Sequence, residues 1–168
     1  MKTSLLLLFV YLLSLGGTGQ DEVMAFKQLQ NYLPVHIDGY TAGEPGGQSI
    51  SIEGLTFSSA DIEFTNTDGD FIKISLLDYA GASTLYQTAA ATWQAGVTYE
   101  SDDITFNQVT WNEHISGWEQ YHKTERKSII ALGIANRFFL TIEASNQDNL
   151  DLVISIAENM DLDKLALK

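Results

Sequence analysis

The chain has 168 residues, of which 45% are hydrophobic, and its 22 acidic and 9 basic residues give a formal net charge of −13. This negative charge repels phosphate backbones and anionic lipid surfaces, so we expect the protein to bind neither nucleic acid nor such membranes. The absence of cysteine excludes disulfides and cysteine-based catalysis.

The N-terminus has the pattern of a secretory signal peptide. Lys2 is followed by the apolar run Leu5–Leu15 and by the small residues Gly16–Gly19. The run is shorter than the roughly 20 apolar residues that span a bilayer. We therefore predict a signal peptide over residues 1–19, cleaved near Gly19/Gln20, and one domain over 20–168 that is periplasmic or extracellular. The lack of cysteine and of Asn-x-Ser/Thr sites favours a bacterial protein.

In the first half of this domain, apolar spacing predicts a short helix from Val23 to Leu33, ended by Pro34. The glycine-rich stretch 38–47 predicts a loop, and Ser49–Glu53 a short strand. Alternation over 60–65 and 71–76, with Asp68-Gly69 between, predicts a hairpin whose two turn residues both have positive φ.

The second half begins with an alanine-rich helix over 82–95 that ends at Gly96, with Leu85, Ala89 and Trp93 on its buried face. A loop is expected over 97–104. Four strands follow: Phe106–Trp111, Trp118–Thr124, Lys127–Ile134 and Arg137–Ala144, the last two joined by a tight turn at Ala135-Asn136. A final helix is predicted from Gln147, capped by Asn146, with Leu150, Val153, Ile154 and Ala157 on its buried face.

Consecutive strands joined by short turns predict an α+β fold. We expect a mainly antiparallel sheet of about six or seven strands, with two or three helices packed on it.

Five segments of the chain resemble a group of exported bacterial proteins that has no assigned activity: Gly39–Pro45, Phe57–Ala60, Ile74–Gly81, Gly117–Glu119 and Arg137–Phe138. The order of elements is also similar to the Mog1/PsbP-type α/β/α sandwich. The first resemblance implies an exported protein. The second implies an accessory or assembly factor rather than an enzyme.

The chain has three histidines, His36, His114 and His122, and none has a short metal-ligand spacing to another. A hairpin turning near Ser116-Gly117 would bring His114 and His122 together, where Glu113 would help them to hold a metal or to act in acid–base catalysis. Ordinary surface histidines are the other interpretation.

A second candidate is a cationic patch. Lys123, Arg126, Lys127 and Arg137 are half of the cations left after signal cleavage, and they lie at the ends of predicted strands. They would bind an anion, or they are simply solvated charges at hairpin turns.

Two more candidates are single residues. Glu44 lies in the glycine-rich loop, which is either a partner-binding loop or a plain connection. Trp118 is either an exposed aromatic that stacks on a ligand or a core residue. The run Asn66–Asp70 lacks the spacing of an EF-hand loop, so no calcium is expected there.

No catalytic or cofactor motif is present, so we expect no cofactor and a non-enzymatic domain that binds a protein partner or a small ligand at the cell envelope. One alternative is a small exported hydrolase or metal-dependent enzyme that uses His114 or His122 with a carboxylate. The other is a structural or assembly factor. The partner and the oligomeric state are not predicted.

Overall fold

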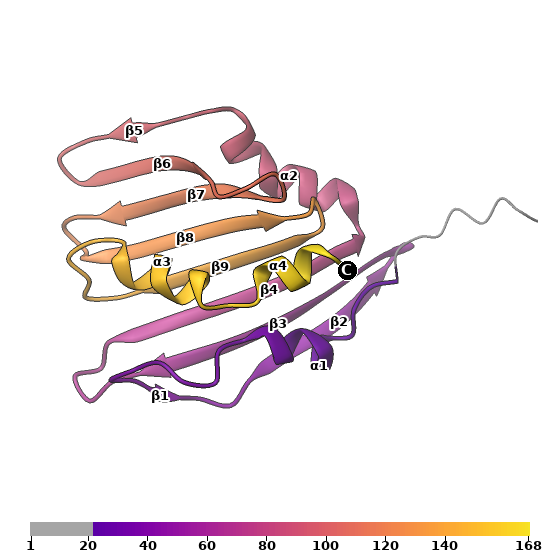
Figure 1. Cartoon of the computed structure of the whole chain (residues 1–168), viewed down its shortest axis with the longest axis horizontal. Coiled ribbons are helices and arrows are strands. Elements are labelled where there is room, and N and C mark those ends of the chain that lie inside the picture. The colour runs from indigo at the N-terminus through magenta and orange to yellow at the C-terminus, as the bar shows by residue number, and fades with distance from the viewer. Residues whose placement is uncertain (1–21) are drawn as a thin grey trace, which may run out of the picture.

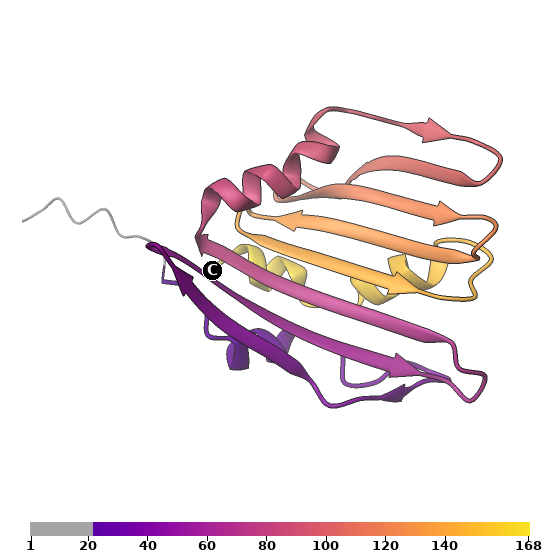
Figure 2. The ribbon, with the colours of Figure 1, turned by 180° about the vertical axis from the view of Figure 1, so that it is seen from behind.

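The computed structural model describes residues 22–168, apart from the side chain of Thr92. The predicted signal peptide over residues 1–19 lies outside the described residues. The described chain forms one nine-stranded antiparallel sheet with helices on both faces (Figures 1 and 2). The α+β class and the antiparallel sheet are confirmed, and the expected count of six or seven strands is too low.

The strands are β1 (Thr41–Ala42), β2 (Gly46–Ile52), β3 (Leu55–Thr65), β4 (Phe71–Gly81), β5 (Tyr99–Glu100), β6 (Ile104–Thr110), β7 (Ile115–His122), β8 (Lys127–Ile134) and β9 (Phe138–Ala144). Their order in the sheet is β1-β3-β4-β9-β8-β7-β6-β5, and β2 pairs with β3 beyond the point where β1 ends. Most neighbours are joined by hairpins. The exceptions are the pairing of β1 with β3, which skips β2 in the chain, and the pairing of β4 with β9, which joins the two halves of the sheet at its centre.

The additional strands lie at the two edges of the sheet, in segments predicted to be loops. β1 falls within 38–47, β5 falls within 97–104, and β2 begins inside the glycine-rich stretch at Gly46. These corrections share a physical cause. Edge pairing uses backbone groups, so a long neighbouring strand recruits residues whose side chains show no alternation.

Two predicted turns have different outcomes. Ala135 and Asn136 have φ of 51° and 54°, which confirms the tight turn between β8 and β9. The hairpin of β3 and β4 is confirmed, but its turn is not the predicted one. Gly69 has a positive φ of 86°, whereas Asp68 does not. The side-chain oxygen of Asn66 accepts hydrogen bonds from the Asp68 and Asp70 amides, both at 2.9 Å, and so stabilises a longer loop.

The helices are α1 (Phe26–Leu29), the 3₁₀ turn η1 (Gln30–Tyr32), α2 (Ser83–Gln94), α3 (Asp151–Glu158) and α4 (Leu162–Ala166). We call the sheet face that carries α1, η1, α3 and α4 the front face, seen in Figure 1, and the face that carries α2 the back face, seen in Figure 2. The described chain thus has four α-helices where two or three were expected.

The main core lies between the front face and its helices. Alternate residues of β3, β4, β8 and β9 are buried there against α1, α3, α4 and the segment after η1. The last predicted helix begins at Asp151 rather than at Gln147. Asn146 has a positive φ of 54° and is part of the preceding turn. Asn149 accepts a 2.9 Å hydrogen bond from the Asp151 amide instead. The buried residues of this helix are Val153, Ile156 and Ala157.

A smaller core lies on the back face, where Tyr86, Ala90 and Trp93 of α2 pack on Tyr79, Trp118 and Phe139. The prediction that Leu85 belongs to the buried face of this helix is wrong, since Leu85 is 40% exposed. The reason is the lack of a side chain at Gly133 of β8, which lets α2 approach the sheet at this point. A side chain there would meet the hydroxyl of Tyr86 and, at 2.7 Å, the ring of Trp93, so these two residues define the packed side of α2.

Candidate functional site

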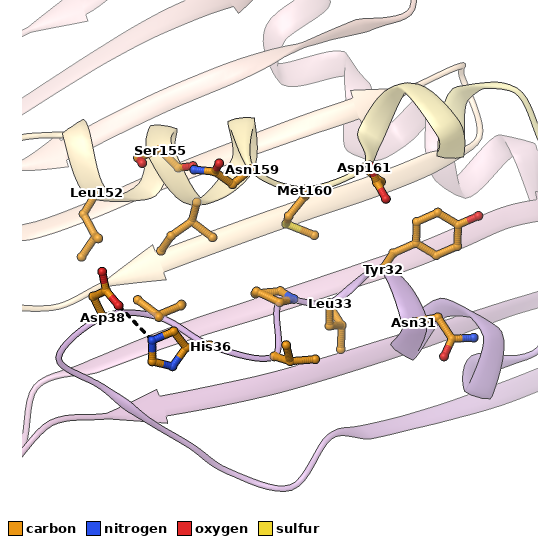
Figure 3. A pocket seen from close by; sticks show the side chains of 14 residues that line it. Asn31, Tyr32, Leu33, His36, Asp38, Leu152, Ser155, Asn159, Met160 and Asp161 are labelled. Atoms are coloured by element: carbon orange, nitrogen blue, oxygen red, sulfur yellow. Dashed lines mark hydrogen bonds and ion pairs between the residues drawn. The ribbon is translucent and has the colours of Figure 1, made fainter.

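A cleft of about 750 Å³ lies on the front face between the segment Leu33–Asp38 and helix α3 (Figure 3). Its walls come from the two ends of the domain in sequence. One wall is the connection between η1 and β1, and the other is the exposed side of α3 together with the residues that lead into α4.

The first wall, Leu33–Asp38, is an exposed segment that is anchored in the core near both of its ends. Leu33 has an extended backbone, and Pro34 follows it, so the 3₁₀ turn cannot continue. Leu33 and Ile37 are both buried in the main core. The chain between them is lifted off the sheet, and Val35 in the middle of this segment is 90% exposed.

The second wall follows from helix periodicity. Leu152, Ser155, Ile156 and Asn159 are spaced as i, i+3, i+4 and i+7, so they form one stripe of α3 facing the cleft. The Asn159 side chain donates a 2.8 Å hydrogen bond to the Ser155 carbonyl and closes the end of the helix. Met160 and Asp161 continue the wall toward α4.

The cleft has an apolar floor and polar rims. Leu33, Ile37, Ile156 and Met160 are its buried apolar lining residues. Figure 3 shows His36 and Asp38 on one side, and Ser155 and Asn159 on the side facing them. An apolar body bound on this floor would therefore have hydrogen-bonding groups on both sides.

Two hydrogen-bonded side-chain pairs lie at the cleft. His36 Nε2 lies 2.9 Å from Asp38 Oδ1, and both side chains are exposed. Asp161 binds Lys164 Nζ at 2.6 Å, and this hydrogen bond raises the pKa of Lys164 above its usual value. Within residues 22–168, Asp38 is the one hydrogen-bond partner of the His36 ring, so no nucleophile is bonded to it there.

The two predicted site histidines do not converge. His114 lies in the turn before β7 and His122 at the far end of that strand. Eight residues of extended chain separate them by about 26 Å. His114 has Glu113 at 3.6 Å, with both side chains exposed. The strand between them continues through Ser116-Gly117 rather than turning there, and so the predicted pairing is wrong.

The predicted cationic patch is divided between opposite ends of β8. Lys123, Arg126 and Lys127 lie near one end, and each is paired with an acid: Lys123 with Glu100 at 3.4 Å, Arg126 with Asp148 at 2.9 Å, and Lys127 with Glu125 at 3.0 Å. This pairing offsets the charge that was expected to bind an anion. Arg137 lies at the other end, just before β9.

Arg137 is part of a buried ion pair. Its Nε and Nη2 atoms donate to the two carboxylate oxygens of Asp78 at 2.8 and 2.7 Å. Asp78 is 0% exposed, and it also accepts bonds from the backbone amides of Met24 and Ala80. Arg137 further donates to the carbonyls of Glu22 and Lys168. This geometry gives Arg137 a structural role that joins both ends of the described chain to β4.

The last two predicted residues lie apart from the cleft. Trp118 is half-buried on the back face, where its ring stacks on Phe106 at 5.3 Å and packs against the core of α2. Glu44 is exposed in the short connection between β1 and β2.

The cleft residues were not predicted from sequence. His36 was noted only as one of three histidines, and Asp38 only as part of a turn. The available signal was one stripe of α3 and its C-cap on which the exposed polar Ser155 and Asn159 alternate with the apolar Leu152 and Ile156.

Neither the protein-family models nor the curated proteins include a match to this chain. The likeness to the Mog1/PsbP-type sandwich therefore stays a prediction. Within residues 22–168, no helix is long and apolar enough to cross a membrane, and no three His, Asp or Glu side chains are grouped to hold a metal ion.

Proposed function

We propose that this protein is a non-enzymatic binding domain at the cell envelope, and that the cleft between Leu33–Asp38 and α3 holds its ligand. The ligand is a small molecule, or a side chain of a partner protein, with an apolar body and polar groups at its sides. The observation that carries the proposal is the apolar floor lying open between two polar rims.

The size and the shape of the cleft support binding. Ligand pockets usually enclose about 300–1,000 Å³ and combine an apolar lining with a few polar groups, and this cleft has about 750 Å³. Both walls are anchored in the main core, through Leu33 and Ile37 on one side and Ile156 on the other. A site on anchored walls loses little conformational entropy when a ligand binds.

The polar groups favour binding over catalysis. An acid–base pair works best where water is excluded and where it is bonded to a reacting group. The His36–Asp38 pair has exposed side chains and no nucleophile bonded to it in the described chain. The alternative of an enzyme that uses His114 or His122 with a carboxylate has little support, because the His114–Glu113 pair, at 3.6 Å, also has exposed side chains.

The first experiment is native mass spectrometry of the protein, purified gently after export from a bacterial host. A bound ligand would add mass that is lost on denaturation. A fragment library is then screened by amide chemical shifts, and the proposal expects shifts grouped at residues 31–38 and 152–161. Binding that shifts other regions instead would contradict it.

A matched pair of variants tests the location. Ser155→Trp places a large ring at the cleft wall, and Gln87→Trp places the same ring at an exposed position of α2 on the back face. We expect Ser155→Trp to abolish binding and Gln87→Trp to preserve it. Equal binding by both variants would refute the assignment of the cleft.

A further inference from the structure

We infer that the outer edge of β2 is a second binding surface, which takes up an extended, basic peptide segment of a partner protein as an additional strand. This surface is separate from the front cleft, and the inference does not depend on the proposed ligand.

The outer side of β2 has no strand beside it. Its seven residues pair with β3 on one side, and no other strand of residues 22–168 pairs with it on the other. Which groups point outward follows from the ladder. The Gly43 amide donates to the Glu63 carbonyl at 2.8 Å, so odd-numbered residues of β3 direct their backbone groups toward β1 and β2. Their β2 partners, Gly46, Gln48 and Ile50, thus direct their backbone groups inward, which leaves Gly47, Ser49 and Ser51 directed outward. Gln30 of η1 donates a 2.8 Å hydrogen bond to the Gly46 carbonyl, so the first residue of the strand is partly covered, whereas Ser49 and Ser51 are exposed.

This edge lacks the usual protection against pairing. Natural proteins block a free edge with lysine, proline, bulges or very short strands. The sequence of β2, Gly-Gly-Gln-Ser-Ile-Ser-Ile, contains no charge and no proline. Ser49, Ser51 and Ile52 are exposed. The edge strands β1 and β5, in contrast, have two residues each and offer little to pair with.

The acidic side chains around β2 favour a basic partner segment. Glu44 lies just before the strand and Glu53 just after it, and both are exposed. Neither has a Lys, Arg or His partner within ion-pair distance among the described residues. Asp61 lies on the back face beside Gly46. Of the cations on elements that pack near β3, Lys27 of α1 lies over the Phe26 ring, and Lys73 of β4 pairs with Glu63.

A second copy of this chain fits the edge poorly. Antiparallel pairing of two β2 strands about Ser49 would place Glu44 of each copy near Glu53 of the other, so like charges would meet at both ends. The net charge of −13 adds repulsion between copies. A partner segment with Lys or Arg at its two ends would pair with Glu44 and Glu53, which are about 30 Å apart along an extended chain.

The test uses a labelled ten-residue peptide of alternating Thr and Val with a Lys at each end, and a second peptide with Glu at each end. Fluorescence anisotropy measures binding, and amide chemical shifts locate it. We expect the Lys peptide to bind and to shift residues 46–52, and the Glu peptide not to bind. Binding of both peptides alike, or shifts spread over the acidic surface, would overturn the inference.

Two kinds of variant make the test specific. Ser49→Pro removes one outward amide without removing a bond to β3, and we expect it to abolish binding. Glu44→Gln/Glu53→Gln keeps the backbone, so it remains informative if the proline variant does not fold, and we expect about three- to tenfold weaker binding. Glu113→Gln/Glu158→Gln removes the same charge elsewhere and should bind as the unchanged protein does. A dimer in sedimentation that Ser49→Pro dissociates would show that a second copy occupies the edge, which would also overturn the inference.

Discussion

Removal of the Arg137 side chain should expose how much the buried ion pair contributes to stability. In Arg137→Met, the carboxylate of Asp78 would keep its hydrogen bonds from the Met24 and Ala80 amides, at 2.7 and 2.9 Å, but would lose both guanidinium bonds. Asp78 is 0% exposed, and the Arg137 side chain is 11% exposed. Water therefore cannot easily replace the guanidinium, and a buried negative charge would be left without its cation.

The expected cost is set by this unpaired charge. Removal of one partner of a buried pair costs about 3–5 kcal/mol, whereas replacement of both partners costs much less. Total stability of a domain is typically about 5–15 kcal/mol, so Arg137→Met should lose a large part of it. Asp78→Asn/Arg137→Met has no buried charge, and it should be at least about 2 kcal/mol more stable than Arg137→Met.

Urea unfolding of the native protein, the two single variants and the double variant gives this comparison as a double-mutant cycle. Hydrogen exchange adds a local test, because Arg137 and Asp78 bind the backbone of Glu22 and Met24. The amides of residues 22–25 should exchange faster in Arg137→Met. A loss below about 1 kcal/mol at pH 7, or no gain in the double variant, would refute the reasoning.

Three further results are expected. Gly133→Ala should destabilise the protein by about 1–3 kcal/mol and change Trp93 fluorescence, because the new methyl group meets Tyr86 and Trp93; unchanged stability would contradict the packing of α2. Burial raises the pKa of Tyr79 and Tyr86 above the usual 10.0. Their contribution to stability is then fully present below about pH 10 and is lost as the pH rises through the folded-state values, and Tyr86→Phe should reduce this loss in alkaline urea titrations. His36→Ala and Asp38→Ala, both exposed, should change stability by no more than about 0.5 kcal/mol.

The central hairpins were predictable because their signals are local. Alternation in β3, β4 and β9 marks which residues face the core, and Ala135-Asn136 leaves room for only a tight turn between two strands. Helix α2 was predicted within a residue or so at each end, since alanine-rich composition and Gly96 are also local signals. Its buried side was not, because Gly133, some forty residues away, decides which residues of α2 can approach the sheet.

The candidate site was not predictable because it depends on distant parts of the chain. The cleft joins residues 31–38 to residues 152–161, and no spacing within either segment says that the two face each other. The same limit explains why the predicted pairing of His114 with His122 is wrong. The assumption of a turn at Ser116-Gly117 brought His114 and His122 together, but Gly117 lies mid-strand, against the Ala131 carbonyl, where β7 and β8 approach closely.

The positions of the two proposed surfaces suggest that binding and stability depend on different residues. The buried residues of β4, β8 and β9 dominate the main core, and they include none of the exposed groups at the cleft rims or on the outer edge of β2. Both surfaces use the chain before β3, which packs on the sheet through a few anchors such as Leu29, Leu33 and Ile37. Substitutions at the rims or on the edge should therefore alter binding with little loss of stability, whereas substitutions at the anchors should affect both.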